Sequence, residues 1–456
     1  MDRMQEMQKR QQEFFETGIT RSAGFRRAAL KRLLDAVKRW EPKLLQALQE
    51  DLGKAPFEGY VAELAVVYEE IRTLRDHVSA WMRPRRVRCS KPQFPARCFV
   101  QPDPLGSVLI LSPWNYPVQL ALAPLAAALA AGNCAVVKPS RFAEKTAAVL
   151  GEMLETSFPR GLVDVVPGGE GSNRELLRLK WDHIFFTGSP AVGRAVMEAA
   201  AAHLTPVTLE LGGKSPCILD ETADLKLAAR RIAWGKLINA GQTCVAPDYV
   251  LLPQGMVHDF VREFGLAVAR MYGEEPLRCP DYGKIVNEKH MERLKGLLQS
   301  GFAAVGGVYS DEERKISPTV LTDVSWDSPV MQEEIFGPIL PVIPYQSFAD
   351  ALHQVKSRPE PLAVYLFTHD RDHERRVLEE LRFGGGCVND VVVHLTNPRM
   401  PFGGVGDSGM GAYHGKVGFL TFSHLKSVMK AQTALDLPLR YPPYYGKLPF
   451  ARLLLR

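Results

Sequence analysis

Two side chains that could cooperate in covalent chemistry stand 34 residues apart, each in a polar segment that contains glycine. Cys244 lies in the run NAGQTCVAP, and Glu210 lies in LELGGKSP. A free cysteine thiol has a pKa of roughly 8.5, so a thiol that attacks a substrate needs a lowered pKa or a base that takes its proton. The two segments therefore supply a candidate nucleophile and a candidate base.

The surroundings of Cys244 favour a reactive thiol over an ordinary core residue. A free cysteine is most often a small buried hydrophobe. Here the polar and flexible residues Gly241, Gln242 and Thr243 follow an apolar stretch at 232–238, as expected where the backbone must come close to a ligand. The pattern indicates a loop that presents Cys244 to a bound molecule.

A further segment has the composition of an anion-binding turn. Residues 188–193 follow the strand-like run HIFFT and precede the helix-forming run RAVMEAAAAH, and Pro190 suits the first turn of a helix. The same segment is also compatible with an ordinary strand-to-helix turn. By contrast, the literal G-x-G-x-x-G at 404–409 follows no buried strand and leads into more glycine, so we do not interpret it as a dinucleotide fingerprint.

Seven motifs, in order along the chain, carry a resemblance to a known family. Besides the two segments above, they are SPWNYP at 112–117, VVKPS at 136–140, FFTGSPAVGR at 185–194, EEIFGP at 333–338 and PFGGVGDSGMGAYHGK at 401–416. In identity, order and separation these segments resemble the aldehyde dehydrogenase superfamily. The little chain before SPWNYP and the ending FLTFSHLKS followed by RYPP are most similar to the class 3 type, which is short and dimeric.

The resemblance implies a reaction and a set of site residues. It implies NAD(P)-dependent oxidation of medium-chain aliphatic or aromatic aldehydes to carboxylic acids, through a thiohemiacetal and then a thioester on Cys244. It implies that Glu210 activates the hydrolytic water and that Asn115 donates to the oxyanion. The residues implied to bind the cofactor are Trp114, Lys138, Ser140, Arg141, Gly188, Ser189, Val192, Gly193, Leu211, Glu334 and Phe336.

One position departs from the family pattern and bears on the choice of cofactor. Many relatives read K-P-S-E, with the glutamate on the ribose hydroxyls, whereas this chain reads KPSR and places Arg141 there. A carboxylate would repel a 2′-phosphate, but an arginine can accept one. We therefore expect NADP to be used at least as well as NAD. The alternative is that Arg141 points to solvent at the start of a helix.

The elements that must position these residues follow from the periodicity of the chain. Apolar residues recur at helical spacing from 12 to about 78. From 108 onward, short apolar runs alternate with helical stretches; these runs are VLIL, AVVK, VDVV, HIFF and VTLEL. The alternation predicts an α/β fold with a doubly wound parallel sheet, in which ligands bind at the carboxyl ends of the strands. The residues that end or follow the predicted strands include Asn115, Lys138, Gly188 and Glu210.

We predict that the chain divides into three parts. A dinucleotide-binding domain takes 1–88 and 102–209, and an α/β catalytic domain takes 210–395. The resemblance implies a small bridging element for oligomerisation, built from 89–101 and 396–456, and it also implies a homodimer.

Composition argues against several other classes of protein. With 456 residues, of which 46% are hydrophobic and 23% charged, the chain is typical of globular proteins, and a net charge of +5 is too small for its length to indicate nucleic-acid binding. The seven cysteines contain no C-x-x-C pair, which fits a reducing compartment and gives no support for a metal site. The basic stretch at 83–88 is typical of a solvated linker or a charged edge strand.

Neither end of the chain predicts a membrane-spanning segment. The N-terminal MDRMQEMQKRQQEFFETG lacks the apolar core of a secretory signal, and the longest apolar run, 120–131, falls well short of roughly 20 residues. We therefore expect a cytoplasmic protein. The C-terminal KLPFARLLLR is apolar and basic, which is compatible with peripheral membrane contact.

Three other functions are compatible with parts of the sequence. A CoA-acylating aldehyde dehydrogenase would share the fold and the nucleophile, but it would not need the base Glu210. A cysteine hydrolase would need a histidine partner, which cannot be chosen among eleven scattered histidines. A protein that keeps the fold only for binding is opposed by the joint presence of Cys244, Glu210 and Asn115.

Overall fold

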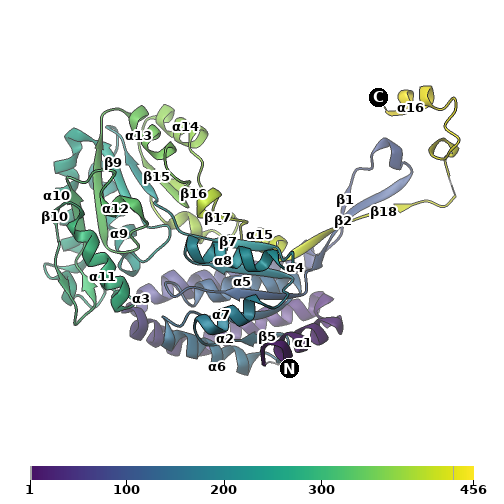
Figure 1. The fold of residues 1–456 in the computed structure, drawn as a ribbon, viewed down its shortest axis with the longest axis horizontal. Helices are drawn as coiled ribbons and strands as arrows, with labels where there is room; N and C mark the ends of the chain where they lie inside the picture. The colour runs from purple at the N-terminus through teal and green to yellow at the C-terminus, as the bar shows by residue number, and fades with distance from the viewer. Residues whose placement is uncertain (1–2, 435, 456) are drawn as a thin grey trace.

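The computed structural model describes residues 3–434 and 436–455; residues 1, 2, 435 and 456, which belong to the predicted parts 1–88 and 396–456, lie outside the described residues. The body of the molecule consists of two α/β lobes, and a long β arm that carries the C-terminal segment extends away from one of them (Figure 1). The helices that open the chain are α1 (Arg3–Glu16), η1 (Ile19–Arg21), α2 (Ala23–Leu52), α3 (Pro56–Gly59), η2 (Tyr60–Leu64) and α4 (Ala65–Trp81).

The helical opening starts earlier than the sequence predicted. The periodic pattern begins at residue 12, yet α1 begins at Arg3, because Met4 and Met7 pack into the apolar layer on one face of the first sheet. The hydroxyl of Ser22 then accepts the N–H of Phe25 at 3.4 Å and caps α2.

The five predicted strands form a parallel sheet in the first lobe. They are β3 (Ser107–Leu111), β4 (Cys134–Lys138), β5 (Val163–Val165), β6 (His183–Thr187) and β7 (Val207–Glu210). The connecting helices are α5 (Gln119–Ala131), α6 (Glu144–Ser157), α7 (Glu170–Leu177) and α8 (Pro190–Ala201). Helices α2, α4, α5 and α6 share one apolar core with the sheet, whereas α1, α7 and α8 share another. The predicted doubly wound fold is thus confirmed.

The glycine-rich segment at 404–409 opens no crossover helix. It forms η9 (Gly406–Ser408) and then β17 (Gly409–Met410), which pairs antiparallel with β7 at the sheet edge. The strand order is β17-β7-β6-β3-β4-β5. The segment therefore lacks the strand-to-helix setting of a dinucleotide fingerprint.

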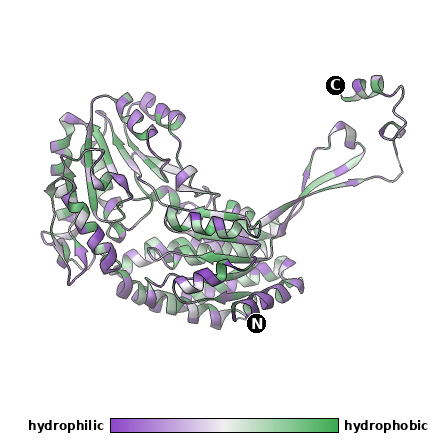
Figure 2. Cartoon of the chain, viewed as in Figure 1, coloured by the Kyte–Doolittle hydropathy of each residue, from purple (hydrophilic) through white to green (hydrophobic). Residues whose placement is uncertain are grey.

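A seven-stranded sheet forms the second lobe, in the order β10-β13-β14-β9-β8-β15-β16. Its strands are β8 (Pro216–Leu219), β9 (Tyr249–Pro253), β10 (Phe302–Val305), β13 (Thr319–Thr322), β14 (Ile339–Tyr345), β15 (Ala363–Phe367) and β16 (Gly385–Val388). Its helices are α9 (Leu225–Leu237), α10 (Val257–Tyr272), α11 (Glu288–Leu297), α12 (Pro329–Gln332), α13 (Phe348–Lys356) and α14 (Arg371–Glu380). Apolar colour is concentrated on the strands of both lobes, as expected for sheets covered on two faces (Figure 2).

Short elements connect the strands and helices of the second lobe. They are η4 (Ile238–Gly241), η5 (Gln254–Met256), η6 (Pro276–Arg278), η7 (Leu298–Ser300), η8 (Val393–Thr396), β11 (Tyr309–Ser310) and β12 (Lys315–Ile316).

The arm is an antiparallel sheet in the order β1-β2-β18. Its elements and those that follow it are β1 (Arg85–Val87), η3 (Lys91–Gln93), β2 (Ala96–Pro104), β18 (Ser423–Ala431), η10 (Pro438–Arg440) and α16 (Leu448–Leu455), whereas α15 (Gly415–Thr421), just before β18, packs into the core of the first lobe. All residues of β1 are exposed, which agrees with a charged edge strand. None of the helices within the described residues combines the length and the apolar character needed to cross a membrane. The division into three parts stays a prediction.

Candidate active site

The predicted site residues gather at one edge of the first sheet. Strands β3, β6 and β7 are parallel neighbours, so their carboxyl ends point the same way. Asn115 follows β3, Gly188 follows β6, and Glu210 is the last residue of β7. The backbone N–H of Gly188 donates to the carbonyl of Glu210 at 3.0 Å, which joins two of these segments directly.

A cleft of 860 Å³ opens at this edge and is lined by residues of both lobes. This volume is typical of a small-molecule site. The predicted residues that line it are Trp114, Asn115, Gly188, Ser189, Glu210, Leu211, Cys244, Glu334 and Phe336. The predicted residues that do not line it are Lys138, Ser140, Arg141, Val192 and Gly193.

Cys244 stands on a loop with an unusual backbone. Three successive residues before it have positive φ, namely Asn239 (53°), Ala240 (53°) and Gly241 (77°). Such a backbone persists only where its surroundings hold it. The buried amide of Gln242 does so: its Nε2 donates to the carbonyls of Asn239 and Lys284, both at 3.0 Å, and its Oε1 accepts the N–H of Val286 at 2.9 Å. The nucleophile loop is therefore fixed in place.

Two close approaches lock this loop and the strand end of Glu210 against the EEIFGP segment. A Cβ on Gly241 would lie 2.2 Å from the carbonyl oxygen of Gly337, so only glycine fits there. A Cβ on Gly212 would lie 1.9 Å from Oε2 of Glu334. Three motifs that are distant in the sequence thus share one packed junction.

Charged side chains hold the EEIFGP segment. Arg293 donates to Oε1 of Glu333 at 2.9 Å and also to the backbone carbonyl of Ile335. The Lys214 ammonium donates to the carbonyl of Glu333 at 2.9 Å and pairs with Asp248 at 2.5 Å. Asp248 in turn accepts the N–H of Ile335 at 3.0 Å. Glu334 and Phe336 therefore face the cleft from a braced turn.

Glu210 and Glu334 are carboxyl groups with unusual surroundings. Both carboxyl oxygens of Glu210 and Oε1 of Glu334 are buried and have no hydrogen-bond partner among the described residues. Burial raises the pKa of Glu210 well above its ordinary value. Burial, together with the charge of Asp248, raises the pKa of Glu334 to about 8. A carboxylate whose pKa is raised holds a proton more strongly, so its ionised form is a better base than an exposed carboxylate.

The thiol of Cys244 is not activated by its surroundings alone. Burial raises the pKa of Cys244 to about 12, and the charges of Glu334 and Glu210 act in the same direction. The thiol form therefore dominates at neutral pH, and attack on a substrate requires a base that removes the proton. The two carboxyl groups on the same cleft are candidates for that base.

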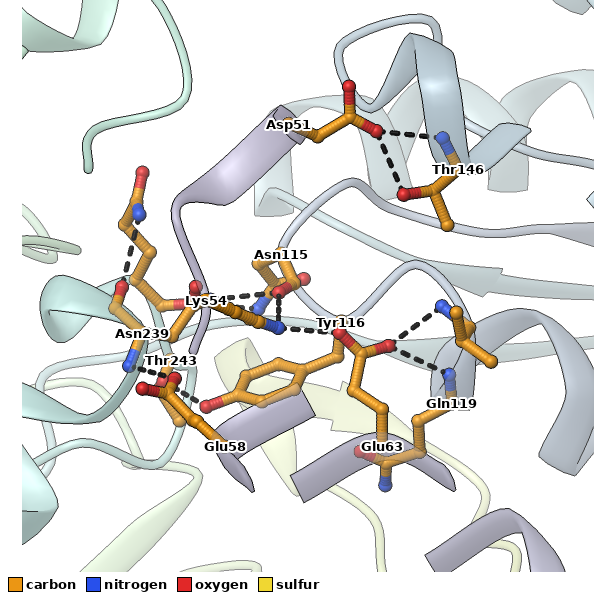
Figure 3. A network of polar contacts seen from close by, with 12 residues as sticks. Asp51, Lys54, Glu58, Glu63, Asn115, Tyr116, Gln119, Thr146, Asn239 and Thr243 are labelled. Carbon is orange, nitrogen blue, oxygen red and sulfur yellow. Dashed lines mark hydrogen bonds and ion pairs between the residues drawn. The ribbon is translucent and has the colours of Figure 1, made fainter. Parts of the chain in front are cut away.

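Asn115 contacts the nucleophile loop directly. Its Nδ2 donates to the carbonyl of Gln242 at 3.1 Å, two residues before Cys244. Next to it, the hydroxyl of Tyr116 lies 2.7 Å from the hydroxyl of Thr243, and Figure 3 shows the two side chains pointing toward each other. An asparagine amide carries two N–H donors, so this contact leaves a second donor for an oxyanion in the cleft.

The start of α8 is suited to bind the phosphate groups of a dinucleotide, and aromatic residues of the same cleft are suited to contact its nicotinamide ring. Ser189 precedes α8, Pro190 is its first residue, and the first N–H groups of a helix favour an anion. The Thr187 hydroxyl lines the same cleft and has no partner among the described residues. Trp114 and Phe336 also line the cleft, and their rings meet edge-on with centroids 5.4 Å apart.

Lys138 is the last residue of β4, and Ser140 and Arg141 follow it, on the side of β3 away from β6. The Lys138 ammonium donates to the carbonyl of Pro139 at 2.9 Å, and burial and the charge of Arg141 lower the pKa of Lys138 to about 8. Arg141 is exposed and lies over the ring of Phe142, 5.1 Å from its centroid. These residues form a cationic region beyond the cleft. On α8, Val192 is half exposed and Gly193 packs against Leu211.

The residues that brace the site were not singled out from the sequence. They are Lys54, Glu63, Lys214, Asp248 and Arg293. Lys214 stands inside LELGGKSP, so its motif offered a signal, whereas Lys54, in the turn between α2 and α3, and Arg293, on α11, belong to no motif. Lys236 is buried on α9, its ammonium has no hydrogen-bond partner among the described residues, and burial lowers the pKa of Lys236 to about 8.

Comparisons with known proteins agree with this arrangement. The profile described as "Aldehyde dehydrogenase family" matches residues 3–428. The 4,4'-diaponeurosporen-aldehyde dehydrogenase of Staphylococcus aureus is 44% identical over 441 residues, which cover 96% of each chain. The rat protein named "Aldehyde dehydrogenase, dimeric NADP-preferring" is 42% identical over 97% of this chain and 98% of its own. A solved structure of Staphylococcus aureus AldH in a substrate-bound state has a TM-score of 0.98, at 42% identity and with 100% of both chains covered.

Proposed function

Because the chain belongs to the aldehyde dehydrogenase family and is therefore an oxidoreductase, we propose that it oxidises aldehydes to carboxylic acids with NADP or NAD, through a thioester on Cys244. The observation that carries the proposal is that Cys244, Glu210 and Asn115 line a single cleft although they come from three separate segments. The chemistry of the three side chains matches the three needs of the reaction, which are a nucleophile, a base and an oxyanion donor.

In the first step the sulfur of Cys244 attacks the aldehyde carbon. The thiol proton passes to a carboxylate on the cleft, a C–S bond forms, and the carbonyl electrons move to oxygen to give a thiohemiacetal. The second N–H of Asn115 and the backbone N–H of Cys244 stabilise that oxyanion. One such donor typically contributes roughly 3 kcal/mol, or about a hundredfold in rate.

The residues that would hold the dinucleotide surround the second half of the cleft. The 188–193 turn and the start of α8 would hold the pyrophosphate, Glu334 would hold the nicotinamide ribose, and Phe336 would pack beside the nicotinamide ring. When bound, the cofactor accepts the hydride that leaves the thiohemiacetal carbon, and a thioester remains on Cys244.

Glu210 completes the cycle as the base for hydrolysis. Its carboxylate takes a proton from a water that attacks the thioester carbon, and the C–S bond breaks to release the acid and the cysteine. Two observations support this role: neither carboxyl oxygen has a partner among the described residues, and burial favours uptake of a proton.

We propose NADP as a cofactor at least as good as NAD. Arg141 supplies a positive charge where a ribose-binding glutamate would oppose a 2′-phosphate, and Lys138 stands beside it. The rat relative named as NADP-preferring is consistent with this choice.

The substrate we propose is an apolar aldehyde of the medium-chain aliphatic or aromatic class. Leu120, Phe402 and Tyr413 contribute apolar surface to the cleft, and one relative is named for a 4,4'-diaponeurosporen aldehyde.

Nothing in the comparisons supports the CoA-acylating alternative, and a base placed for water would be superfluous in that chemistry. A cytoplasmic location stays a prediction.

A homodimer is the assembly we propose. The rat relative is named as dimeric, and the outer edge of β18 in the arm has no strand partner among the described residues. Leu425 and Met429 on this strand are about half exposed. An unpaired strand with apolar side chains is a surface that a second copy can cover.

Absorbance at 340 nm tests the proposed function. The protein is mixed with NAD⁺ or NADP⁺ and a series of aldehydes, with and without CoA, and the products are identified by mass spectrometry. We expect reduced cofactor and free carboxylic acid in equal amounts, with or without CoA. Production of acyl-CoA alone, or no reduction with any aldehyde, would overturn the proposal.

A further inference from the structure

A buried ion pair lies directly behind the oxyanion donor. The ammonium of Lys54, between α2 and α3, contacts Oε1 of Glu63 at 2.6 Å, and both side chains are fully buried. The same ammonium donates to the backbone carbonyl of Asn115 at 2.8 Å and lies 4.0 Å from the centre of the Tyr116 ring. Figure 3 shows Lys54 pointing toward these groups.

Glu63 holds the other end of the same short segment. Its Oε2 accepts the backbone N–H of Val118 at 2.8 Å and that of Gln119 at 3.1 Å, at the start of α5. The first N–H groups of a helix have no partner within the helix, and a carboxylate satisfies them well. Lys54 and Glu63 therefore hold the 115–119 segment by hydrogen bonds to one backbone carbonyl and two backbone N–H groups.

Lys54 and Glu63 are linked to the loop of Cys244 through Asn115 and not through the cleft. The Asn115 carbonyl that Lys54 binds also accepts Nδ2 of Asn239 at 2.8 Å, and the Asn115 side chain donates to Gln242 at 3.1 Å. Neither Lys54 nor Glu63 lines the cleft. Neither residue can therefore contact the substrate where it is expected to bind.

The pair is costly as a means of stability alone. Removing two charges from water carries a desolvation penalty that the attraction between them often fails to offset, so apolar side chains of similar size would commonly serve folding as well. The two charges compensate each other, so they place little net field on an oxyanion nearby. A role in positioning neighbouring groups explains why an ion pair, which has no net charge but forms strong hydrogen bonds, lies at this position.

We infer that Lys54, braced by Glu63, is a positioning residue that holds Asn115 and the loop of Cys244 in the geometry that oxyanion stabilisation requires. The inference rests on the proposed function of Asn115 and Cys244. A displacement of about 1 Å in such a site typically lowers the rate about 100-fold.

The primary test is a double-mutant cycle between Lys54→Met and Asn115→Ala. If Lys54 acts through Asn115, K54M lowers kcat/KM for the aldehyde about 10- to 100-fold in the wild-type background and less than about threefold in the N115A background. The Kd for NADP⁺ should change less than about twofold. An equal loss in both backgrounds would show that Lys54 does not work through the amide.

Arg26→Met is the matched control. Arg26 is also a buried cation on α2, but it donates to the carbonyl of Ala130, at the far end of α5. R26M should lower the melting temperature without changing kcat/KM. If R26M lowered kcat/KM as much as K54M, loss of a buried cation rather than positioning would explain the effect.

The double variant K54M/E63Q keeps the test decisive if K54M does not fold. It leaves no unpaired buried charge, and the glutamine oxygen can still accept the two amides at the start of α5. We expect it to fold and to keep the loss of kcat/KM, and full activity in this variant would overturn the inference.

Alkylation of Cys244 by iodoacetamide separates this inference from the proposed function. Loosening the link from Lys54 to Gln242 should make Cys244 react several-fold faster in K54M or K54M/E63Q, whereas R26M should match the wild type. If the wild type oxidises no aldehyde, the proposed function fails, and the alkylation rates still decide the role of Lys54. Equal rates in all variants would overturn that role.

Discussion

The groups that hold the site and the groups proposed to react in it are similarly buried but differ in their hydrogen bonding. Lys54 and Gln242 are fully buried, and their polar atoms contact carboxylate, carbonyl and amide partners. Glu210 is also buried, yet neither of its oxygens has a partner among the described residues, and the same is true of Oε1 of Glu334. An unpaired buried polar atom costs roughly 1–3 kcal/mol. The difference indicates that these atoms are reserved for groups that arrive with water, substrate or cofactor.

Among the proposed reacting groups, the nucleophile Cys244 should cause the largest loss of activity when it is replaced. We expect Cys244→Ser to lower kcat at least about 10⁴-fold, because the covalent step is lost while the fold accepts a side chain of nearly the same shape. Cys387→Ser is the control, since Cys387 is another partly buried cysteine of the second lobe. Rates at 340 nm and melting temperatures measure both variants. Substantial activity in C244S would show that another group attacks the aldehyde.

Replacing Glu210 should separate the two halves of the reaction. In Glu210→Gln we expect a burst of reduced cofactor of nearly full amplitude, followed by a steady rate lower by about 10²- to 10⁴-fold, because only hydrolysis needs this base. Stopped-flow absorbance with stoichiometric enzyme measures both phases. A steady rate equal to that of the wild type would remove Glu210 from the mechanism, and loss of the burst would assign it to the first proton transfer.

The unpaired carboxyl of Glu334 should appear in the pH dependence of Cys244. With the pKa of Cys244 raised to about 12, the thiolate fraction and the alkylation rate rise about tenfold per pH unit below that value. Glu334 becomes negative as pH passes about 8 and then opposes the thiolate. In the Glu334→Gln variant, Cys244 should therefore be alkylated a few-fold faster than in the wild type at pH 9.5 and at nearly the same rate at pH 6.5. A ratio that does not change with pH would argue against this coupling.

A change in cofactor preference rather than in the chemical steps is expected at Arg141, which is exposed and lies outside the cleft. Arg141→Glu should shift the ratio of kcat/KM for NADP to that for NAD about tenfold toward NAD, because a carboxylate repels the 2′-phosphate. The value for NAD itself should change little. Steady-state kinetics with both cofactors measures the ratio, and an unchanged ratio would mean that Arg141 does not contact the cofactor.

The sequence was informative wherever a local pattern determines the structure. Alternating apolar runs are sufficient to place β3 to β7, because strands buried on both faces must be continuously apolar. The motifs placed Cys244, Glu210 and Asn115 at one cleft through the resemblance, and their roles stay predictions. The contacts of Lys54 could not be predicted, because tertiary packing alone brings the turn after α2, the helix η2 that carries Glu63 and the loop after β3 that carries Asn115 together. The raised pKa of Cys244 could not be predicted for the same reason, because the burial that raises it depends on the packing of both lobes.

The junction at Gly241 and Gly212 bears on how this enzyme can change under selection. A Cβ at Gly241 would overlap the backbone carbonyl oxygen of Gly337, and the φ of +77° there already favours glycine, whereas a Cβ at Gly212 would meet the carboxylate end of the Glu334 side chain, which can shift. In a saturation library scored for activity, Gly241 should therefore tolerate as few replacements as Cys244, and Gly212 should tolerate more, although neither carries a reactive atom. The space between two loops constrains evolution here as strictly as the chemistry does.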